Sequence, residues 1–316
     1  MENLPHGFRS DFADCGEVRL HFVTNAAPDQ SPQGQDPRTP IVFLHGFPEF
    51  WRAWEPVFRP LASDYQIIAL DQRGFNLSDA PADVSNYTTR KLVGDLVALT
   101  SQLLGKRAFV LAGHDWGASV AYAAAIGFPQ MVRALVIANG VHPVLFQKAL
   151  IDDAGQRKAS QYIHVLKDAQ AAARMSENSY ARTLSMLEKF SAAPWLDAGL
   201  RQAYIDAFSK EGRLDAMLNW YRASPIVVPK PDEDVPLPAL YHGTPDQFAV
   251  TMPHLLIWGL KDTALLPVSR KGIETFASKV ELVEFETGDH WLLHTHGPQI
   301  AAEIDQFVKR NAINHS

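Results

Sequence analysis

Residues 113–117 have the sequence GHDWG and place an aspartate, Asp115, between two glycines. The apolar run AFVLAG (108–113) precedes this motif, and the small-residue run ASVAYAAAIG (118–127) follows it. This context predicts a tight turn between a strand and a helix, where esterases with a GxSxG motif carry their serine. A carboxylate at that turn suits attack on a saturated carbon, because the product is an alkyl ester that an activated water can cleave. Taken alone, GHDWG is equally compatible with a turn whose aspartate only caps a helix.

A nucleophile of this kind needs a base, and the base needs an acid to orient it, in the chain order nucleophile, acid, base. Asp262 follows the apolar run HLLIWG (254–259), and His290 follows the run VELVEFE (280–286). Because open α/β sheets bind ligands at the carboxyl ends of their strands, we predict Asp262 as the acid and His290 as the base. Asp289 is a rival for the acid, but its position next to His290 makes a hydrogen bond between the two side chains awkward.

The motif HGFP (45–48) follows another apolar run, IVFL. A glycine-containing turn there can direct a backbone N–H toward the charge that develops when water attacks an ester. We predict that the N–H groups of Phe47 and Trp116 form this oxyanion hole. The substrate pocket is expected at the same motif, with the residues His45, Gly46, Pro48 and Trp51, and with further aromatic wall residues Trp54, Phe190 and Trp195.

Short apolar runs alternate with helical stretches, which predicts an α/β fold with a doubly wound, mostly parallel sheet. Several runs are continuous rather than alternating, as in strands that are buried on both faces. The first one or two strands are expected to pair antiparallel at an edge, and the Pro- and Gln-rich segment 26–40 is expected to form a surface loop. The expected strands are 18–23, 41–46, 66–71, 108–113, 134–140, 254–259 and 280–286.

From Pro143 to about Pro236 the strand pattern is replaced by helical patterns, as at 156–175 and 200–222. A helical block between two strands predicts an inserted cap over the sheet. We therefore expect a core domain formed by residues 1–142 and 237–316 and a helical cap, or lid, formed by residues 143–236. The acidic, Pro-rich segment 227–247 is expected to connect the two layers.

The composition excludes several classes of protein. At 47% hydrophobic and 20% charged residues, the 316-residue chain resembles ordinary globular proteins. Its net charge of −6 is not concentrated in blocks, so nucleic acid and membrane surfaces are not expected partners. One cysteine, Cys15, cannot form an intrachain disulfide. Neither a secretory signal nor a long apolar span is visible, so we expect a cytoplasmic protein.

Five segments of the chain resemble the soluble epoxide hydrolase branch of the α/β-hydrolase family: HGFPEFWRAW (45–54), LDQRGFNLSDAP (70–81), GHDWG, LNWYR (218–222) and WGLKDTALLP (258–267). The resemblance implies the α/β-hydrolase fold with a cap, a nucleophile at Asp115, a base at His290 and an acid at Asp262. It also implies oxyanion donors at Phe47 and Trp116. One departure is Asn76, at a position where relatives usually carry glycine; asparagine tolerates positive φ, so we expect the turn to be kept.

Two substrate classes suit such a triad, epoxides and alkyl halides, and they differ in whether a proton donor is needed. Epoxide opening generates a strongly basic alkoxide, for which a protonated tyrosine is a suitable donor, whereas a halide leaves as a stable anion. The resembling epoxide hydrolases carry two cap tyrosines, which match Tyr221 and, more weakly, Tyr162. Haloalkane dehalogenases usually place asparagine where Phe47 stands, and fluoroacetate dehalogenases tend to carry arginine where Trp116 stands. Rival tyrosines are Tyr180, Tyr204 and Tyr241.

The sequence therefore predicts an epoxide hydrolase that forms a vicinal diol through an aspartyl ester. The alternatives are a haloalkane or haloacid dehalogenase with the same triad, and a non-catalytic receptor that keeps the fold as a binding pocket. The expected partners are a small epoxide and water, with no metal or organic cofactor, in a monomer or homodimer. The pair of histidines in HWLLH (290–294) lacks the glutamate of the zinc motif HExxH.

Overall fold

The computed structural model describes residues 4–27, 36–191 and 194–311. In these residues, eight strands form one sheet in the order β1-β2-β4-β3-β5-β6-β7-β8. Strands β3 to β7 are buried because their apolar side chains point to both faces, whereas the edge strand β8 is partly exposed. The strands are β1 (Arg9–Asp14), β2 (Arg19–Thr24), β3 (Thr39–Leu44), β4 (Tyr65–Leu70), β5 (Phe109–His114), β6 (Val132–Ala138), β7 (His254–Gly259) and β8 (Val280–Phe285).

The sheet confirms the predicted α/β class. β1 pairs antiparallel with β2, and β2 pairs antiparallel with β4, whereas the pairs from β4 to β8 are parallel. The antiparallel edge was therefore predicted correctly, although β1 itself was not predicted. Of the expected surface loop at 26–40, residues 28–35 lie outside the described residues, and Thr39 and Pro40 begin β3.

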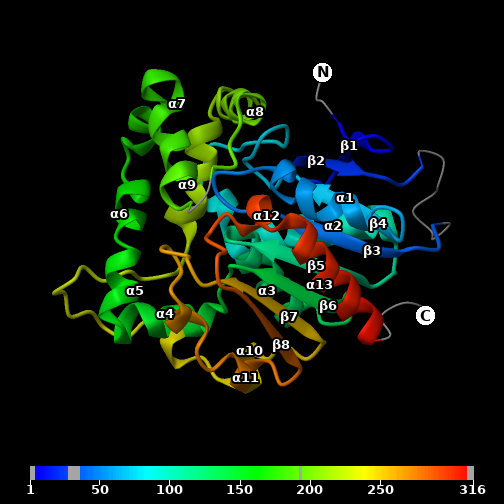
Figure 1. Ribbon diagram of the computed structural model, residues 1–316. Coiled ribbons are helices and arrows are strands. Elements are labelled where there is room, and N and C mark those ends of the chain that lie inside the picture. Colours follow the sequence, from blue (N-terminus) through cyan, green and yellow to red (C-terminus); the bar gives the residue numbers. More distant parts are fainter. Residues whose placement is uncertain (1–3, 28–35, 192–193, 312–316) are drawn as a thin grey trace.

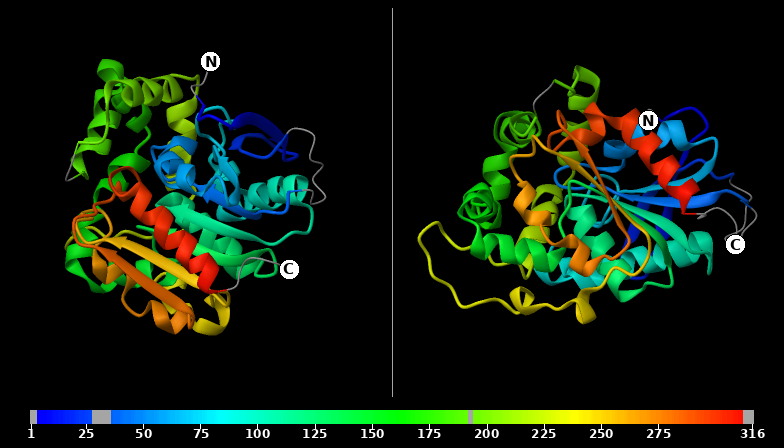
Figure 2. Two further views of the ribbon diagram at one scale, coloured as in Figure 1. Left: turned by 45° about the vertical axis from the view of Figure 1, so that its right-hand side comes forward. Right: turned by 60° about the horizontal axis from the view of Figure 1, so that its bottom comes forward.

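Helices cover both faces of the sheet (Figures 1 and 2). Along the sheet, the chain moves in one direction from β3 to β4 and in the opposite direction from β4 to β5 and from β5 to β6. Because crossovers between parallel strands are right-handed, the first connection puts α1 on one face of the sheet, and the other two put α2 and α3 on the opposite face. α13 packs against α1 and buries its apolar positions 300, 304, 307 and 308. These helices are α1 (Glu55–Leu61), α2 (Thr89–Leu104), α3 (Trp116–Gly127), α11 (Ile273–Phe276), α12 (Leu292–Thr295) and α13 (Gly297–Arg310), with 3₁₀ turns η1 (Trp51–Trp54), η2 (Val84–Tyr87) and η4 (Pro267–Arg270).

Between β6 and β7 the chain forms a group of helices that lies beside the sheet, at the left of Figure 1. α4 begins at Pro143, the first residue of the proposed cap, and the proposed exit at 236 falls between α9 and η3. The helical patterns at 156–175 and 200–222 form several shorter helices, and α7 is interrupted at 177–180. The elements are α4 (Pro143–Asp152), α5 (Ala154–Ala159), α6 (Tyr162–Lys167), α7 (Ala171–Lys189), α8 (Ala198–Phe208), α9 (Arg213–Ala223), η3 (Ala239–His242) and α10 (Pro245–Phe248).

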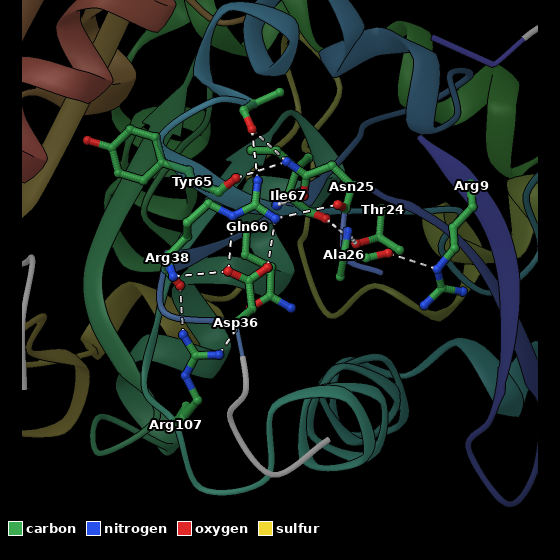
Figure 3. Close-up of polar contacts among 11 residues, drawn as sticks. Arg9, Thr24, Asn25, Ala26, Asp36, Arg38, Tyr65, Gln66, Ile67 and Arg107 are labelled. Carbon is green, nitrogen blue, oxygen red and sulfur yellow. Dashed lines mark hydrogen bonds and ion pairs between the residues drawn. The ribbon is translucent and has the colours of Figure 1, made fainter. Parts of the chain in front are cut away.

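Polar side chains connect the amino ends of β3, β4 and β5 (Figure 3). Arg38, directly before β3, donates to both carboxylate oxygens of Asp36 at 3.0 and 2.7 Å and to the Ala62 carbonyl at 3.0 Å. Arg107, which precedes β5, donates to the Arg38 carbonyl at 2.7 Å and to the Gln66 side chain at 3.1 Å. These contacts link the amino ends of the three strands to one another. No helix in the described part of the chain is long and apolar enough to cross a membrane.

Candidate active site

Asp115 lies at the tight turn between β5 and α3. Its backbone has φ 49° and ψ −117°, a left-handed conformation that is costly for a non-glycine residue and that often occurs at functional sites. The turn requires glycine at 117, because a Cβ atom there would overlap the backbone carbonyl of Leu44. As the N-cap of α3, the Asp115 carboxylate lies at the positive end of the helix dipole.

The turn after β3 holds the Asp115 carboxylate from the other side. The backbone N–H of Phe47 donates to Asp115 Oδ1 at 2.8 Å, and the Phe47–Pro48 peptide bond is cis. Trp116 is the first residue of α3, where backbone N–H groups have no partner within the helix. The two backbone N–H groups predicted for the oxyanion hole thus come from the two segments that flank the Asp115 side chain.

His290 connects the other two predicted residues. Its Nδ1 lies 2.8 Å from Asp262 Oδ2, and its Nε2 lies 3.7 Å from Asp115 Oδ2. Asp262 Oδ1 accepts the backbone N–H groups of the residues at 264 and 265, so this carboxylate is fixed. Asp289, the rival acid, instead accepts the backbone N–H of Trp291 at 2.8 Å. The structure thus brings together Asp115, Asp262 and His290.

Charges around His290 determine its protonation. Burial alone would lower the pKa of His290, but the charge and hydrogen bond of Asp262, followed by the charges of Asp115 and Glu49, raise that pKa to about 9. The imidazole is therefore protonated at neutral pH. Neutralising Asp115 by esterification would remove one of the causes that raise the pKa.

Tyr162 and Tyr221 line the same cavity as Asp115. Tyr221 is buried, and its ring makes edge contacts with Phe47 and Trp116 at centroid distances of 5.1 and 5.0 Å. Burial and then the charge of Asp115 raise the pKa of Tyr162 above its usual range. Burial, followed by Tyr162 and Asp115, raises the pKa of Tyr221 well above 10. Both hydroxyl groups therefore stay protonated across the physiological range.

The rival tyrosines lie elsewhere. The hydroxyl of Tyr204 donates to Glu49 Oε1 at 2.9 Å, and that of Tyr241 donates to Asp152 at 3.1 Å. Tyr180 packs against Phe208. None of these three is among the described residues that line the cavity.

The cavity has a volume of about 310 Å³ and mainly apolar walls. One face of α3 lines it along the whole helix, with Trp116, Ser119, Ala123, Ile126 and Gly127. The opposite walls come from the helical segment between β6 and β7 and from the segment that returns to β7. An uncharged organic group is the chemistry that such walls accept.

The wall residues differ from those that the sequence indicated. His45, Gly46, Pro48 and Trp51 are not among the described lining residues, and neither are Phe47, Trp54, Phe190 and Trp195. The His45 side chain is fully buried against Gln72, and Trp51 stacks on Phe58 in the core. Gly46 is instead in contact with the Asp115 side chain. The HGFP turn thus contributes the backbone N–H of Phe47 to the site, and the Phe47 ring contacts Tyr221.

Within residues 4–27, 36–191 and 194–311, no group of three His, Cys, Asp or Glu side chains is arranged to hold a metal ion. The two histidines of HWLLH face different carboxylates. His290 contacts Asp262, and His294 Nε2 lies 2.7 Å from Glu49 Oε1.

A family model described as "alpha/beta hydrolase fold" matches residues 39–297. The chain belongs to the α/β-hydrolase fold family. The AB hydrolase superfamily protein YfhM of Bacillus subtilis (strain 168) is 32% identical over 309 residues, which cover 96% of this chain and 99% of that protein. Epoxide hydrolase 4 of Mus musculus is 29% identical over 300 residues, which cover 92% and 77%.

A solved structure from a study of novel epoxide hydrolases in metagenomes from hot environments superimposes with a TM-score of 0.82. It is 31% identical, and the match covers 95% of this chain and 98% of that one. These similarities place this α/β hydrolase in the epoxide hydrolase branch of the family.

A buried carboxylate that the sequence did not indicate, Glu49, lies against His114, the residue before Asp115 in this α/β hydrolase. Glu49 accepts hydrogen bonds from Tyr204 and His294, and its Oε2 lies 3.3 Å from His114 Nδ1. Burial alone would raise the pKa of Glu49, but contacts with the two histidines hold it below its usual range. His114 precedes Asp115 in the chain, and its Nε2 donates to the His290 carbonyl at 2.8 Å. Glu49 directly follows the HGFP motif, but its partners Tyr204, His294 and His114 come from distant segments of the chain.

Proposed function

We propose that this α/β hydrolase converts an epoxide and water into a vicinal diol through a covalent ester on Asp115. The observation that carries the proposal is that the Asp115 carboxylate and two tyrosines, Tyr162 and Tyr221, line one apolar cavity. The similarity to epoxide hydrolases supports the same reaction. In this proposal residues 143–236 form the cap that supplies both tyrosines.

In the first step the two tyrosine hydroxyls donate hydrogen bonds to the epoxide oxygen. A carboxylate oxygen of Asp115 attacks a ring carbon, the ring C–O bond breaks, and one tyrosine gives its proton to the oxygen that leaves. Because the pKa values of both tyrosines are raised, they remain protonated until a strongly basic alkoxide develops. The product is a β-hydroxyalkyl ester of Asp115.

In the second step His290 takes a proton from water, and the resulting hydroxide adds to the ester carbonyl carbon. The ester carries no charge, so the contribution of Asp115 to the raised pKa of His290 is absent; the imidazolium returns its proton to the tyrosinate left by the first step, and the neutral imidazole then acts as the base. The N–H groups of Phe47 and Trp116 stabilise the oxyanion. Collapse of the tetrahedral intermediate breaks the bond between the ester carbonyl carbon and the alkyl oxygen, restores the carboxylate and releases the diol.

The tyrosine pair favours an epoxide over a halide, because a departing halide needs no proton. Assays of racemic styrene oxide and 1-bromobutane in parallel test this choice. We expect formation of 1-phenylethane-1,2-diol without release of bromide. Bromide release without diol formation would instead support the dehalogenase.

Replacing the base tests the covalent step. His290→Gln should permit attack on styrene oxide but block ester hydrolysis, so intact mass spectrometry should show an adduct of one substrate on Asp115. Asp115→Asn with the same epoxide is the matched control and should stay unmodified. A His290→Gln protein that forms no adduct and retains full activity would refute the mechanism. Absence of both adduct and turnover in every form would support a non-catalytic receptor.

We also propose that the protein is cytoplasmic and forms a monomer or a homodimer.

A further inference from the structure

Asn139 directly follows β6, the strand between β5 and β7, and it is fully buried. Its backbone has a φ of 36°, in the left-handed region, where asparagine occurs more often than most other residues with a side chain. Residues held in this region often lie at functional sites. Asn139 is not among the described residues that line the cavity, so it can act on the reaction only through its neighbours.

Asn139 is bonded to the two strand ends beside it. Its backbone carbonyl accepts the N–H of Asp115 at 3.3 Å. Its side-chain Oδ1 accepts the N–H of Gly259 at 2.7 Å, and Gly259 is the last residue of β7, three positions before Asp262. The nucleophile and the loop of the acid are therefore connected to the same residue.

The nitrogen of the Asn139 amide holds the loop of the base. Nδ2 donates to the Asp289 carbonyl at 2.6 Å, and that carbonyl belongs to the peptide bond that joins Asp289 to His290. The next carbonyl, that of His290 itself, accepts a hydrogen bond from His114 Nε2 at 2.8 Å. The backbone is thus held on both sides of the His290 side chain, and the place of the imidazole depends on these two contacts.

Loss of the Asn139 amide should move this loop, because the groups that the amide holds are buried. Asp289 is 2% exposed, and Gly259 is a buried residue of β7, so neither peptide group could bind water where it now lies. The two segments are also in close contact, since a Cβ atom added to Gly259 would lie 2.8 Å from the Asp289 carbonyl oxygen. The amide therefore sets the separation between the end of β7 and the loop of the base.

We infer that Asn139 is a positioning residue for ester hydrolysis, whose side-chain amide holds His290 where it can activate water against the ester of Asp115. The inference rests on the proposed function, since it concerns the second step of that reaction. His290 Nε2 lies 3.7 Å from Asp115 Oδ2, and a shift of the loop changes that distance. Ester formation uses Asp115 and the two tyrosines but not His290, so the two steps should respond differently to a change at Asn139.

Asn139→Gly tests the inference, because glycine keeps the left-handed backbone and the hydrogen bond from the Asp115 N–H but removes the amide. Single turnovers with styrene oxide, quenched with acid and followed by intact mass spectrometry, separate the two steps. Ester formation should stay close to the wild-type rate, whereas decay of the ester should slow by about 10²-fold, as expected for a misplacement of about 1 Å. Decay at the wild-type rate, or equal slowing of both steps, would overturn the inference.

Asn25→Gly is the matched control, because the Asn25 side chain also joins backbone groups of neighbouring segments (Figure 3). It donates to the Ala62 and Tyr65 carbonyls at 2.8 and 3.0 Å and accepts the Ile67 N–H at 2.8 Å. These contacts lie at the amino end of β4, whereas the triad lies at the carboxyl ends of the strands. The control should lower the melting temperature and leave both steps at wild-type rates. A selective loss of ester hydrolysis in Asn25→Gly would also overturn the inference.

Asn139→Ser is the second variant and decides the question if Asn139→Gly does not fold. Its hydroxyl lies too close to the backbone to reach both partners of the amide, so ester decay should again slow more than ester formation. An unchanged ratio of the two rates would overturn the inference.

The titration of His290 separates this inference from the proposed function, since it needs no turnover. Burial lowers the pKa of His290, but the pair with Asp262 raises that pKa to about 9. In Asn139→Gly the pKa should fall toward about 6.5, measured by NMR of the imidazole nitrogens, because the displaced base loses contact with Asp262. If the wild type forms neither ester nor diol and this pKa falls in the variant, the proposed function is wrong and the positioning role stands. If the wild type forms both, and neither the pKa nor ester decay changes in the variant, the positioning role is wrong and the proposed function stands.

Discussion

Gly46 offers a sensitive test of the active-site geometry. A Cβ atom added to Gly46 would lie 2.5 Å from the Asp115 Cβ and 2.6 Å from its Oδ1. Since non-bonded carbon atoms normally lie about 3.5–4.0 Å apart, Gly46→Ala must displace Asp115 or its own turn by about 1 Å. Either movement disrupts the hydrogen bond of 2.8 Å from the Phe47 N–H to Asp115 Oδ1.

The expected loss of activity is large. A misplacement of about 1 Å costs roughly 10²-fold in rate, and loss of one oxyanion donor costs about 10²–10³-fold. We therefore expect Gly46→Ala to lower kcat/KM for styrene oxide by at least about 10²-fold, which corresponds to about 2.7 kcal/mol of transition-state stabilisation. In the proposed mechanism, formation of the ester should slow as well, because the Asp115 carboxylate is displaced.

The matched control is Gly94→Ala. Gly94 lies within α2, and a Cβ atom added there has no neighbour within 4 Å. This variant should keep full activity and raise the free energy of unfolding by roughly 0.5–1 kcal/mol, since alanine favours helix over glycine. Steady-state kinetics, single-turnover ester formation by mass spectrometry and thermal unfolding should be measured for both variants. A folded Gly46→Ala protein that forms the ester at the wild-type rate would refute the contact between Gly46 and Asp115.

Three further predictions concern protonation. Asp262→Asn removes the main cause of the raised pKa of His290, so that ester hydrolysis should slow by roughly 10²–10⁴-fold and the ester should accumulate in intact-mass spectra; unchanged kcat would contradict the pairing. Tyr221→Phe should slow ester formation by about 10²-fold and leave ester hydrolysis nearly unchanged in pre-steady-state kinetics; a defect confined to hydrolysis would contradict the proton-donor role. Burial lowers the pKa of His142 and of His254 to about 4, below the value of about 6.5 expected when unfolded. The unfolded state therefore binds more protons between pH 6.5 and 4, and the free energy of unfolding should fall there by about 1.4 kcal/mol per pH unit for each histidine. Urea unfolding at pH 7, 5.5 and 4.5 measures this, and equal stability at all three would contradict it. The pKa of His290 is instead raised on folding, so its contribution to the free energy of unfolding should be lost as the pH rises from 6.5 to 9.

The sequence was sufficient for most of the sheet because buried parallel strands have continuous apolar runs, as in HLLIWG, which coincides with β7. The preference for Asp262 over Asp289 followed from a local constraint on adjacent side chains, and the structure shows Asp262 in contact with His290. Strand order along the chain was enough to indicate that Asp115, Asp262 and His290 converge, because parallel strands end at one edge.

The sequence was insufficient where side-chain direction depends on tertiary packing. β1 has an exposed face and only one buried residue, Ala13, so its sequence lacks strand periodicity. The aromatic residues after HGFP suggested a pocket wall, but η1 turns Trp51 and Trp54 into the core beneath the site. The partners of Glu49 are up to 245 residues away in the chain, so no local pattern identifies them.

The buried position of Glu49 limits how freely parts of this protein can be exchanged. Glu49 and His294 belong to the sheet-bearing part of the chain, whereas Tyr204 comes from α8 of the helical segment. A chimera that takes residues 143–236 from another relative leaves this carboxylate with one hydrogen bond fewer unless the graft supplies a hydroxyl at the same place. A buried acceptor left without its hydrogen bond costs about 1–3 kcal/mol, so a grafted segment should be chosen for a hydroxyl at this position as well as for the shape of the cavity.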